Sequence, residues 1–303
     1  MKYTFLFLVL SSFISACNIV RIKQNSATHK LDKQGIVANN FVNDSLTMKY
    51  WKGGSGPVLV FIHGFGGDAL MTWEKELKEF SKNHTVIALD VLWFGASMSI
   101  QKPQLSAQRD AVINLLKSLK IEKATFIGQS YGGFIAIDIA INHPEMTEKL
   151  VIANCPGTTF DVKELEGVCA SFNVKSIEEL FILYKPEHVQ RLVDLSSFSN
   201  PKLPKFLLKQ SFETYFDFNH EQQFLLLNTL PLEQNRFQED AILKTIPTLV
   251  LWGEQDEIFS FDSGKHFAES IEAEFVSIPK CGHAPQIDDH KSFLLLLDKF
   301  FKK

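Results

Sequence analysis

Residues 126–133, FIGQSYGG, place a single serine between a short apolar run and a cluster of glycines. The run before the serine is typical of a buried strand, and the apolar residues after it continue for the length of a helix. A residue at so sharp a strand-to-helix turn adopts a strained backbone, so its neighbours two positions away must be small. Gly128 and Gly132 meet this requirement. The pattern predicts that the Ser130 hydroxyl stands exposed above the carboxyl edge of a sheet, facing a helix N-terminus that favours negative charge.

Strand-like and helical segments alternate around this turn. The apolar runs VLVFIHG, HTVIALD, KATFIGQ and KLVIANCPG are separated by segments with helical spacing, such as LSAQRDAVINLLKSLK. This alternation predicts a mostly parallel sheet with helices on both faces. The pattern stops near Gly157 and resumes with PTLVLWGEQD. We therefore expect an α/β core of residues 41–157 and 244–303, interrupted by a helical insertion of residues 158–243.

The first residues, MKYTFLFLVLSSFISAC, indicate an export signal rather than part of the fold. A lysine precedes an apolar run that is too short to span a bilayer as a mature helix. The ending ISAC resembles the lipobox of bacterial lipoproteins, which implies a signal peptide of residues 1–16 and a lipidated Cys17. Residues 17–40 are polar without a clear period, which predicts a flexible tether between the membrane of the cell envelope and the domain. The alternative is an ordinary signal cleaved near Ala16, with Cys17 incidental.

Charge and cysteine content narrow the function classes. The chain has a net charge of −4 and no basic run, so nothing favours a nucleic-acid partner. The four cysteines include no C-x-x-C pair, which argues against a structural zinc site. We expect neither a metal nor a cofactor, and a Cys155–Cys169 disulfide stays open at this point.

Four motifs carry a resemblance to the α/β-hydrolase fold family over residues 41–303: HGFGG, LDVLWFGAS, GQSYGG and CGH. The resemblance implies that Ser130 is a nucleophile, followed along the chain by an acid and then a histidine. His283, in CGHAPQID, matches the general base. Asp256, in GEQD, matches the orienting acid, and Glu254 is the alternative two residues earlier. Haloalkane dehalogenases and epoxide hydrolases of this fold use an aspartate nucleophile, so the serine speaks against both chemistries.

Attack by a serine on a carbonyl group creates an oxyanion that needs preorganised N–H donors. By the same resemblance, these donors are the backbone N–H groups of Tyr131 and of Phe65 in HGFGG. The side chain of His63, in the same motif, is expected to brace this loop rather than to transfer protons.

The insertion lies where the family places a cap over the active site, and it is rich in phenylalanine. These rings form the core of the cap or line a pocket for an apolar acyl or aromatic group. The expected function is hydrolysis of a small-molecule or lipid carboxylic ester through an acyl-enzyme. Hydrolysis of a carbon–carbon bond, an amide or a thioester, and acyl transfer, use the same triad and stay open. A non-catalytic ligand-binding lipoprotein is the alternative from another class.

Overall fold

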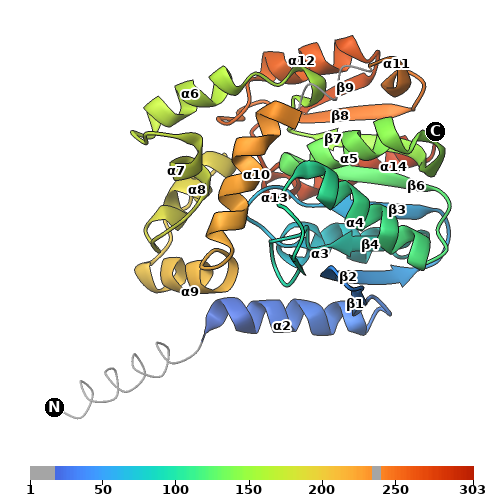
Figure 1. The fold of residues 1–303 in the computed structure, drawn as a ribbon, viewed down its shortest axis with the longest axis horizontal. Coiled ribbons are helices and arrows are strands. Elements are labelled where there is room, and N and C mark those ends of the chain that lie inside the picture. Colours follow the sequence, from blue (N-terminus) through green and yellow to red (C-terminus); the bar gives the residue numbers. More distant parts are fainter. Residues whose placement is uncertain (1–17, 234–239) are drawn as a thin grey trace.

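A sheet of nine strands runs through the part of the chain that the computed structural model describes, residues 18–233 and 240–303 (Figure 1). The expected signal peptide and Cys17 lie outside the described residues. The strands are β1 (Val37–Val42), β2 (Leu46–Gly54), β3 (Val58–Ile62), β4 (Thr85–Leu89), β5 (Met98–Ser99), β6 (Ala124–Gln129), β7 (Thr147–Ala153), β8 (Thr248–Gly253) and β9 (Glu274–Ile278).

The strand order is β1-β2-β4-β3-β6-β7-β8-β9, with β5 paired to β2. Strand β2 is antiparallel to β1, β4 and β5, and the pairs from β4 through β3 to β9 are parallel. Every residue of β6 and β8 is buried, as expected for apolar strands that are covered on both faces. The parallel pairing brings the carboxyl ends of β3, β6, β7 and β8 to one edge, where the site residues follow.

Helices cover both faces of this sheet (Figure 1). They are α2 (Ile19–Asp32), α3 (Ala69–Phe80), α4 (Leu105–Ser118), α5 (Tyr131–Asn142), α6 (Val162–Ser171), α7 (Ile177–Phe181), α8 (His188–Ser196), α9 (Lys205–Tyr215), α10 (His220–Glu233), α11 (Asp240–Leu243), α12 (Phe261–Ser270), α13 (Pro285–Asp288) and α14 (His290–Phe301), with short 3₁₀ turns at Pro144–Met146 and Gly157–Thr159. None of the helices within residues 18–233 and 240–303 combines the length and apolarity needed to span a membrane.

Alternate residues of β3 face two separate hydrophobic cores. Leu59 and Phe61 join the core beneath α2, α3 and α14, whereas Val60 and Ile62 join the core beneath α4, α5 and α12. Two-residue alternation of side chains along a strand produces this division. The α/β-hydrolase architecture expected from the motifs, a mostly parallel sheet flanked by helices, is thereby confirmed.

The expected flexible tether is wrong for most of residues 18–40. The Asn18 side chain accepts a hydrogen bond of 2.9 Å from Arg21 N and begins helix α2, and strand β1 starts at Val37, ahead of the predicted core boundary at Phe41. The sequence hid this helix because its buried stripe is narrow, consisting of Ala27 and Leu31 one turn apart. Packing against α3 and α9, rather than a strong helical pattern, holds α2 in place.

The insertion between β7 and β8 forms helices α6 to α10, and its described residues include no strand. Helix α11 follows and packs on α5, with Leu243 buried in the core of the sheet domain. The helical insertion therefore ends before α11. Phe212 and Leu208 of α9 and Val189 of α8 form a small hydrophobic core of the insertion itself.

Glu76 is an exception to the apolar packing under α3. It is 1% exposed, and burial raises its pKa from 4.5 to about 8. A carboxyl group whose pKa is higher in the folded than in the unfolded chain binds its proton more tightly when folded. The resulting stabilisation is fully present below pH 4.5, and it is lost as the pH rises to about 8, because the carboxyl group must then ionise while buried.

We therefore expect the native chain to lose unfolding free energy as pH rises from 4.5 towards about 8, by about 1.4 kcal/mol per unit at most from this group. Glu76→Gln should flatten that decline, measured by urea unfolding between pH 5 and 8. Glu79→Gln, at an exposed position of the same helix, is the control and should leave the decline unchanged. Equal slopes for the native chain and Glu76→Gln would contradict the expectation.

Candidate active site

Ser130 occupies the turn between β6 and α5 with φ 52° and ψ −121°, a conformation rarely adopted by residues other than glycine. Its backbone N–H donates to the Ala153 carbonyl at 2.8 Å, and its own carbonyl accepts from Gly133 N at 2.8 Å. These bonds fix the turn to the end of β7 and to the first turn of α5. The strained backbone predicted from the glycine spacing is therefore present.

The two elbow glycines are needed for close contact between backbone segments. A Cβ atom on Gly128 would lie 2.4 Å from the Gly132 carbonyl oxygen. A Cβ atom on Gly132 would lie 2.3 Å from the carbonyl oxygen of Ile62 and 2.5 Å from that of His63. Both collisions are with backbone, so no rotamer change relieves them. The elbow is thus pressed directly against the end of β3.

Asp256 and His283 are in direct contact. His283 Nδ1 lies 2.9 Å from Asp256 Oδ2 and 3.0 Å from Oδ1, and the histidine is 5% exposed. A proton on Nδ1 is donated to the carboxylate, which leaves Nε2 as the acceptor. Glu254, the alternative acid, instead accepts a hydrogen bond from Ser277 Oγ at 2.9 Å. Of the two carboxylates, Asp256 is the one positioned to orient His283.

The Asp256 carboxylate has further donors that the sequence did not reveal. Oδ1 accepts from the backbone N–H of Ile258 at 2.8 Å and of Phe259 at 3.2 Å, and Oδ2 accepts from Asn154 Nδ2 at 2.7 Å. Asn154 is fully buried, and its Oδ1 accepts from Gly253 N at 3.3 Å. Its position gave a usable signal, because it directly follows the strand after which some members of this fold carry their acid.

Gln129 joins the histidine loop to the elbow. Its Nε2 donates to the His283 carbonyl oxygen at 3.0 Å, and the glutamine is 6% exposed. Gln129 directly precedes Ser130, so this bond places the backbone of His283 beside the turn that carries the serine. Sequence reasoning treated this residue only as the variable position of G-x-S-x-G.

The HGFGG loop lies against the same turn. A Cβ atom on Gly64 would lie 3.2 Å from Ser130 Cβ, which places the backbone around Gly64 and Phe65 next to the serine. His63 donates from Nδ1 to the Gly64 carbonyl at 2.7 Å and accepts at Nε2 from Val91 N at 3.0 Å. Burial lowers the pKa of His63 to about 4, so its ring is neutral and holds the loop, as the sequence suggested.

Two buried carboxyl groups stabilise the neighbouring loops. Asp90 accepts from Ala69 N at 3.0 Å and from Ala96 N at 2.9 Å, and Asp68 caps α3 by accepting from Met71 N at 2.6 Å. Burial, with the nearby charge of Asp68, raises the pKa of Asp90 to about 7. These bonds connect the loop after β3 to the loop after β4.

Helices of the insertion approach the HGFGG loop from the other side. A Cβ atom on Gly66 would lie 3.4 Å from Phe216 and 3.6 Å from Leu192, and the Phe65 and Phe181 rings are 6.2 Å apart. The insertion therefore lies over the backbone beside Ser130, with apolar side chains facing it.

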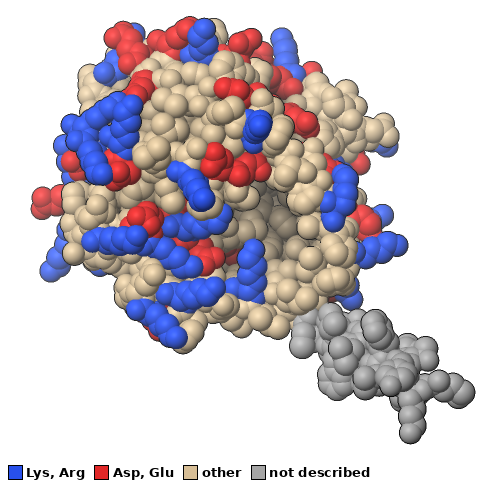
Figure 2. All heavy atoms as spheres, turned by 180° about the vertical axis from the view of Figure 1, so that it is seen from behind, with Lys and Arg blue, Asp and Glu red and all other residues tan. Residues whose placement is uncertain are grey.

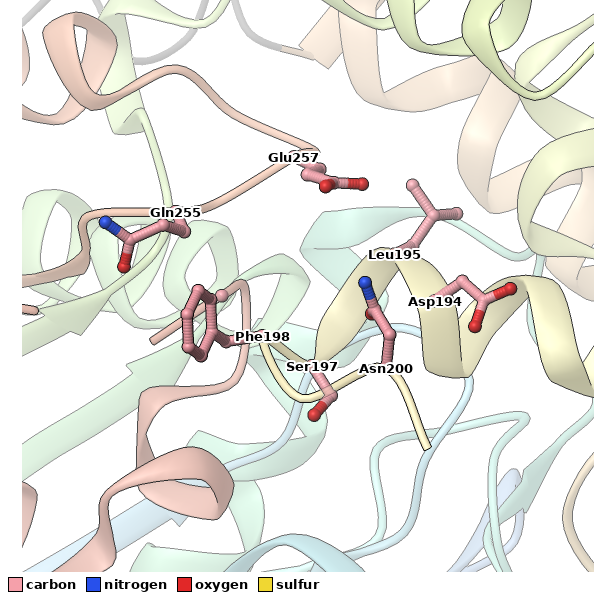
Figure 3. A pocket seen from close by; sticks show the side chains of 8 residues that line it. Asp194, Leu195, Ser197, Phe198, Asn200, Gln255 and Glu257 are labelled. Atoms are coloured by element: carbon pink, nitrogen blue, oxygen red, sulfur yellow. The ribbon is translucent and has the colours of Figure 1, made fainter. Parts of the chain in front are cut away.

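A cavity of about 180 Å³ lies at the seam between the insertion and the acid and histidine loops (Figure 3). It is lined by Asp194, Leu195, Ser197, Phe198, Asn200, Gln255, Glu257 and Gly282. Gln255 and Glu257 flank Asp256, and Gly282 precedes His283, so this cavity adjoins the acid–histidine pair. The rear face of the molecule is also hollowed, with basic and acidic side chains interspersed around the hollow (Figure 2).

The three cysteines among the described residues are not bridged to one another. Cys155, Cys169 and Cys281 are free and buried, so the Cys155–Cys169 pair left open by the sequence is not bridged. Cys155 packs against Gly133, and burial raises the pKa of its thiol. Among the described residues no group of three or more histidine, cysteine or acidic side chains is arranged to hold a metal ion.

The chain is similar in sequence and in fold to several known hydrolases. The chain is 27% identical over 257 residues to the 2-hydroxymuconate semialdehyde hydrolase of Pseudomonas sp. (strain CF600), covering 82% of this chain and 87% of that protein. The crystal structure of a meta-cleavage product hydrolase superposes with a TM-score of 0.72 at 25% identity, over 87% of this chain and 97% of that one. That of a bacterial membrane phospholipase A superposes with a TM-score of 0.74 at 23% identity, over 100% and 98%, and shows the shared fold.

The match to a family model extends over most of the core and the whole insertion. The model described as the alpha/beta hydrolase fold covers residues 57–290, which include the elbow, the HGFGG loop, Asp256 and His283. The chain belongs to the α/β-hydrolase fold family.

Proposed function

We propose that this protein is a serine hydrolase of carboxylic esters with an apolar acyl or aromatic group. The observation that carries the proposal is the contact of His283 with Asp256, together with the Gln129 bond that holds the His283 backbone beside the Ser130 elbow. A serine hydroxyl needs a neighbouring base and an oriented imidazole to act as a nucleophile at neutral pH.

In the proposed mechanism, His283 Nε2 accepts the proton of Ser130 as the serine oxygen attacks the carbonyl carbon. The carbonyl oxygen becomes an oxyanion and accepts hydrogen bonds from the N–H groups of Phe65 and Tyr131. The imidazolium then gives its proton to the leaving alcohol, and an acyl-serine forms. Water repeats the sequence with His283 again as base and releases the carboxylic acid. Asp256 orients the imidazole and stabilises the imidazolium throughout.

The apolar contacts over the HGFGG loop support an apolar acyl or aromatic group. Phe216 and Leu192 lie over Gly66, and Phe181 lies beside the Phe65 ring. A substrate carbonyl at the oxyanion donors would extend its apolar end between these side chains, where water is displaced.

Hydrolysis of a carbon–carbon bond in a vinylogous keto acid is the second candidate. It is favoured by the similarity to proteins named 2-hydroxymuconate semialdehyde hydrolase and meta-cleavage product hydrolase. The same serine, histidine and aspartate would serve this reaction. The expected export signal favours the ester reading, because ring-cleavage products of this kind arise in the cytoplasm.

Ser130→Ala should lower ester turnover by about three orders of magnitude or more and abolish covalent labelling by a fluorophosphonate probe. The assay is a panel of p-nitrophenyl esters of graded chain length, run beside a vinylogous 6-keto acid. Ser260→Ala, in the N-cap of α12, is the control and should keep both labelling and turnover. Turnover of the keto acid with no ester cleavage would select the second candidate, and unchanged turnover in Ser130→Ala would remove the mechanism.

Asn154 is proposed as a positioning residue, because its amide holds Asp256 Oδ2. A hydrogen bond to a charged group contributes about 1.5–3 kcal/mol, so Asn154→Ala should lower kcat by roughly 10- to 100-fold with a much smaller change in KM. Asn173→Ala removes an asparagine from a similar left-handed backbone, φ 52° against 50°, at an exposed site in the insertion. It controls for backbone strain. Equal losses of activity in both variants, matched by equal losses of thermal stability, would sink the positioning role.

The proposed location is the cell envelope, with Cys17 carrying acyl chains. The sequence ISAC after a short apolar run supports this location. Stable anchoring needs two or more chains, since one acyl chain binds a bilayer only marginally.

Native protein should fractionate with membranes, and Cys17→Ala should move to the soluble or uncleaved fraction while the specific ester activity stays near native. Mass spectrometry of the N-terminal peptide is the direct readout, and Cys169→Ala is the matched cysteine control. An unmodified N-terminal peptide on exported native protein would refute the lipid anchor and leave the hydrolase proposal standing.

A further inference from the structure

We infer that the end of the molecule formed by the first turns of α2 and α9 is a surface that rests on a phospholipid bilayer, so that the insertion lies directly at the membrane. The inference rests on the proposed envelope location. In place of the flexible tether expected from the sequence, it has helix α2 hold the domain directly against the membrane. It concerns how the domain is oriented, and it is independent of which bond the Ser130 site hydrolyses.

Almost no chain separates Cys17 from the first helix of the fold. Asn18 caps α2, so one residue separates Cys17 from the first residue of the helix. Between Lys2 and Arg21 the sequence has no charged residue. Wherever this apolar segment or a lipid on Cys17 enters a bilayer, the start of α2 must lie at the surface of that bilayer.

Helix α2 is fixed to both parts of the molecule, so it cannot swing away as a hinge. Gln24 Nε2 donates to Asp68 Oδ2 at 3.0 Å in the core, and Leu31 is fully buried. At its other end, Ile19 N donates to Gln210 Oε1 of α9 at 2.8 Å. Figure 1 shows α2 beside α9 at the edge of the molecule. Membrane contact at the α2 start therefore brings α9 to the membrane as well.

The exposed side chains at this end include large apolar groups. Ile19 is 39% exposed and Ile22 is 55% exposed, and their spacing of three places them on one face of α2. Phe206, 41% exposed, lies one turn before Gln210 on α9, the residue that bonds to Ile19. Apolar side chains gathered where a chain enters a bilayer are typical of interfacial contact.

The charges at this end complement an anionic lipid surface. Arg21 and Lys23 on α2, and Lys205 on α9, are exposed, and the exposed Lys209 of α9 pairs with Glu213 at 3.7 Å. Helix α2 has no acidic residue before Asp32. Basic residues next to inserted apolar side chains strengthen binding to anionic headgroups. This mixture favours a bilayer over a second protein, whose interface core would be depleted of lysine.

The inference also explains how a lipidic ester would reach the site. Phe206 lies in the first turn of α9 and Phe216 directly follows its last residue, so a helical rise of 1.5 Å per residue separates them by about 15 Å. Phe216 lies over Gly66 of the HGFGG loop. A substrate that leaves the bilayer beside Phe206 has one helix length to travel to the proposed oxyanion donors.

The test uses tryptophan as a depth probe in the full chain. All four native tryptophans are at most 2% exposed, so an added surface indole reports separately. Phe206→Trp and Ile22→Trp are reconstituted into vesicles of phosphatidylethanolamine and phosphatidylglycerol with brominated acyl chains, which quench indole fluorescence on contact. The matched control is Leu295→Trp on α14, an apolar position that is 68% exposed and belongs to neither α2 nor α9.

In the brominated vesicles, we expect the fluorescence of the tryptophan added by Phe206→Trp or by Ile22→Trp to fall about twofold or more. The fluorescence of the tryptophan added by Leu295→Trp should not change. Lys205→Glu with Lys209→Glu should weaken quenching of Phe206→Trp, whereas Lys117→Glu should not. Quenching without lipid on Cys17 would support the surface and refute only the anchor. A lipidated protein in which Phe206→Trp stays unquenched would overturn the inference. This holds if the domain stands away from the bilayer, and it also holds if sedimentation shows that this surface forms a dimer.

Discussion

The contact of the elbow with the end of β3 is the constraint on which the site depends. Gly132 lies so close to the carbonyls of Ile62 and His63 that a Cβ atom there would be 2.3 Å and 2.5 Å from their oxygens. The chain continues from His63 into the HGFGG loop. The position of that loop relative to Ser130 is therefore set by backbone against backbone, and does not depend on the rotamer of any side chain.

Buried polar groups hold the loops that follow β3 and β4. The low pKa of His63 keeps its ring neutral, and the raised pKa of Asp90 shifts that carboxyl group towards its neutral form. Both side chains bond to backbone N–H groups or carbonyls of loops that follow β3 and β4. Against this background of neutral groups that brace the loops, the Asp256 carboxylate is the acid in direct contact with His283.

The sequence predicted the strained elbow at Ser130 from the spacing of its glycines, and it pointed to Asp256 and His283 through the resemblance to the α/β-hydrolase fold family. It also predicted the bracing role of His63. It did not predict Asn154 or Gln129, whose bonds to Asp256 and His283 join residues 102 and 154 positions apart. Contacts of that separation depend on strand order, which periodicity does not give. Helix α2 was not predicted for another reason. Its stability comes from packing on α3 and α9 rather than from a strong helical spacing of apolar residues in its sequence.

The structured N-terminal helix changes how motion of the insertion must be understood. Helix α2 is bonded to two parts of the molecule. Its Ile19 is bonded to Gln210 of α9, and its Gln24 is bonded to Asp68, the N-cap residue of α3. Moving α9 away from the core must break the Ile19–Gln210 bond or unwind the first turn of α2. Asp68 directly follows the HGFGG loop, so a strained α2 pulls on the segment that carries the proposed Phe65 donor. Movement of α9 away from the core would therefore disturb the start of α2, and the Gln24–Asp68 bond links that helix to the residue that follows the HGFGG loop.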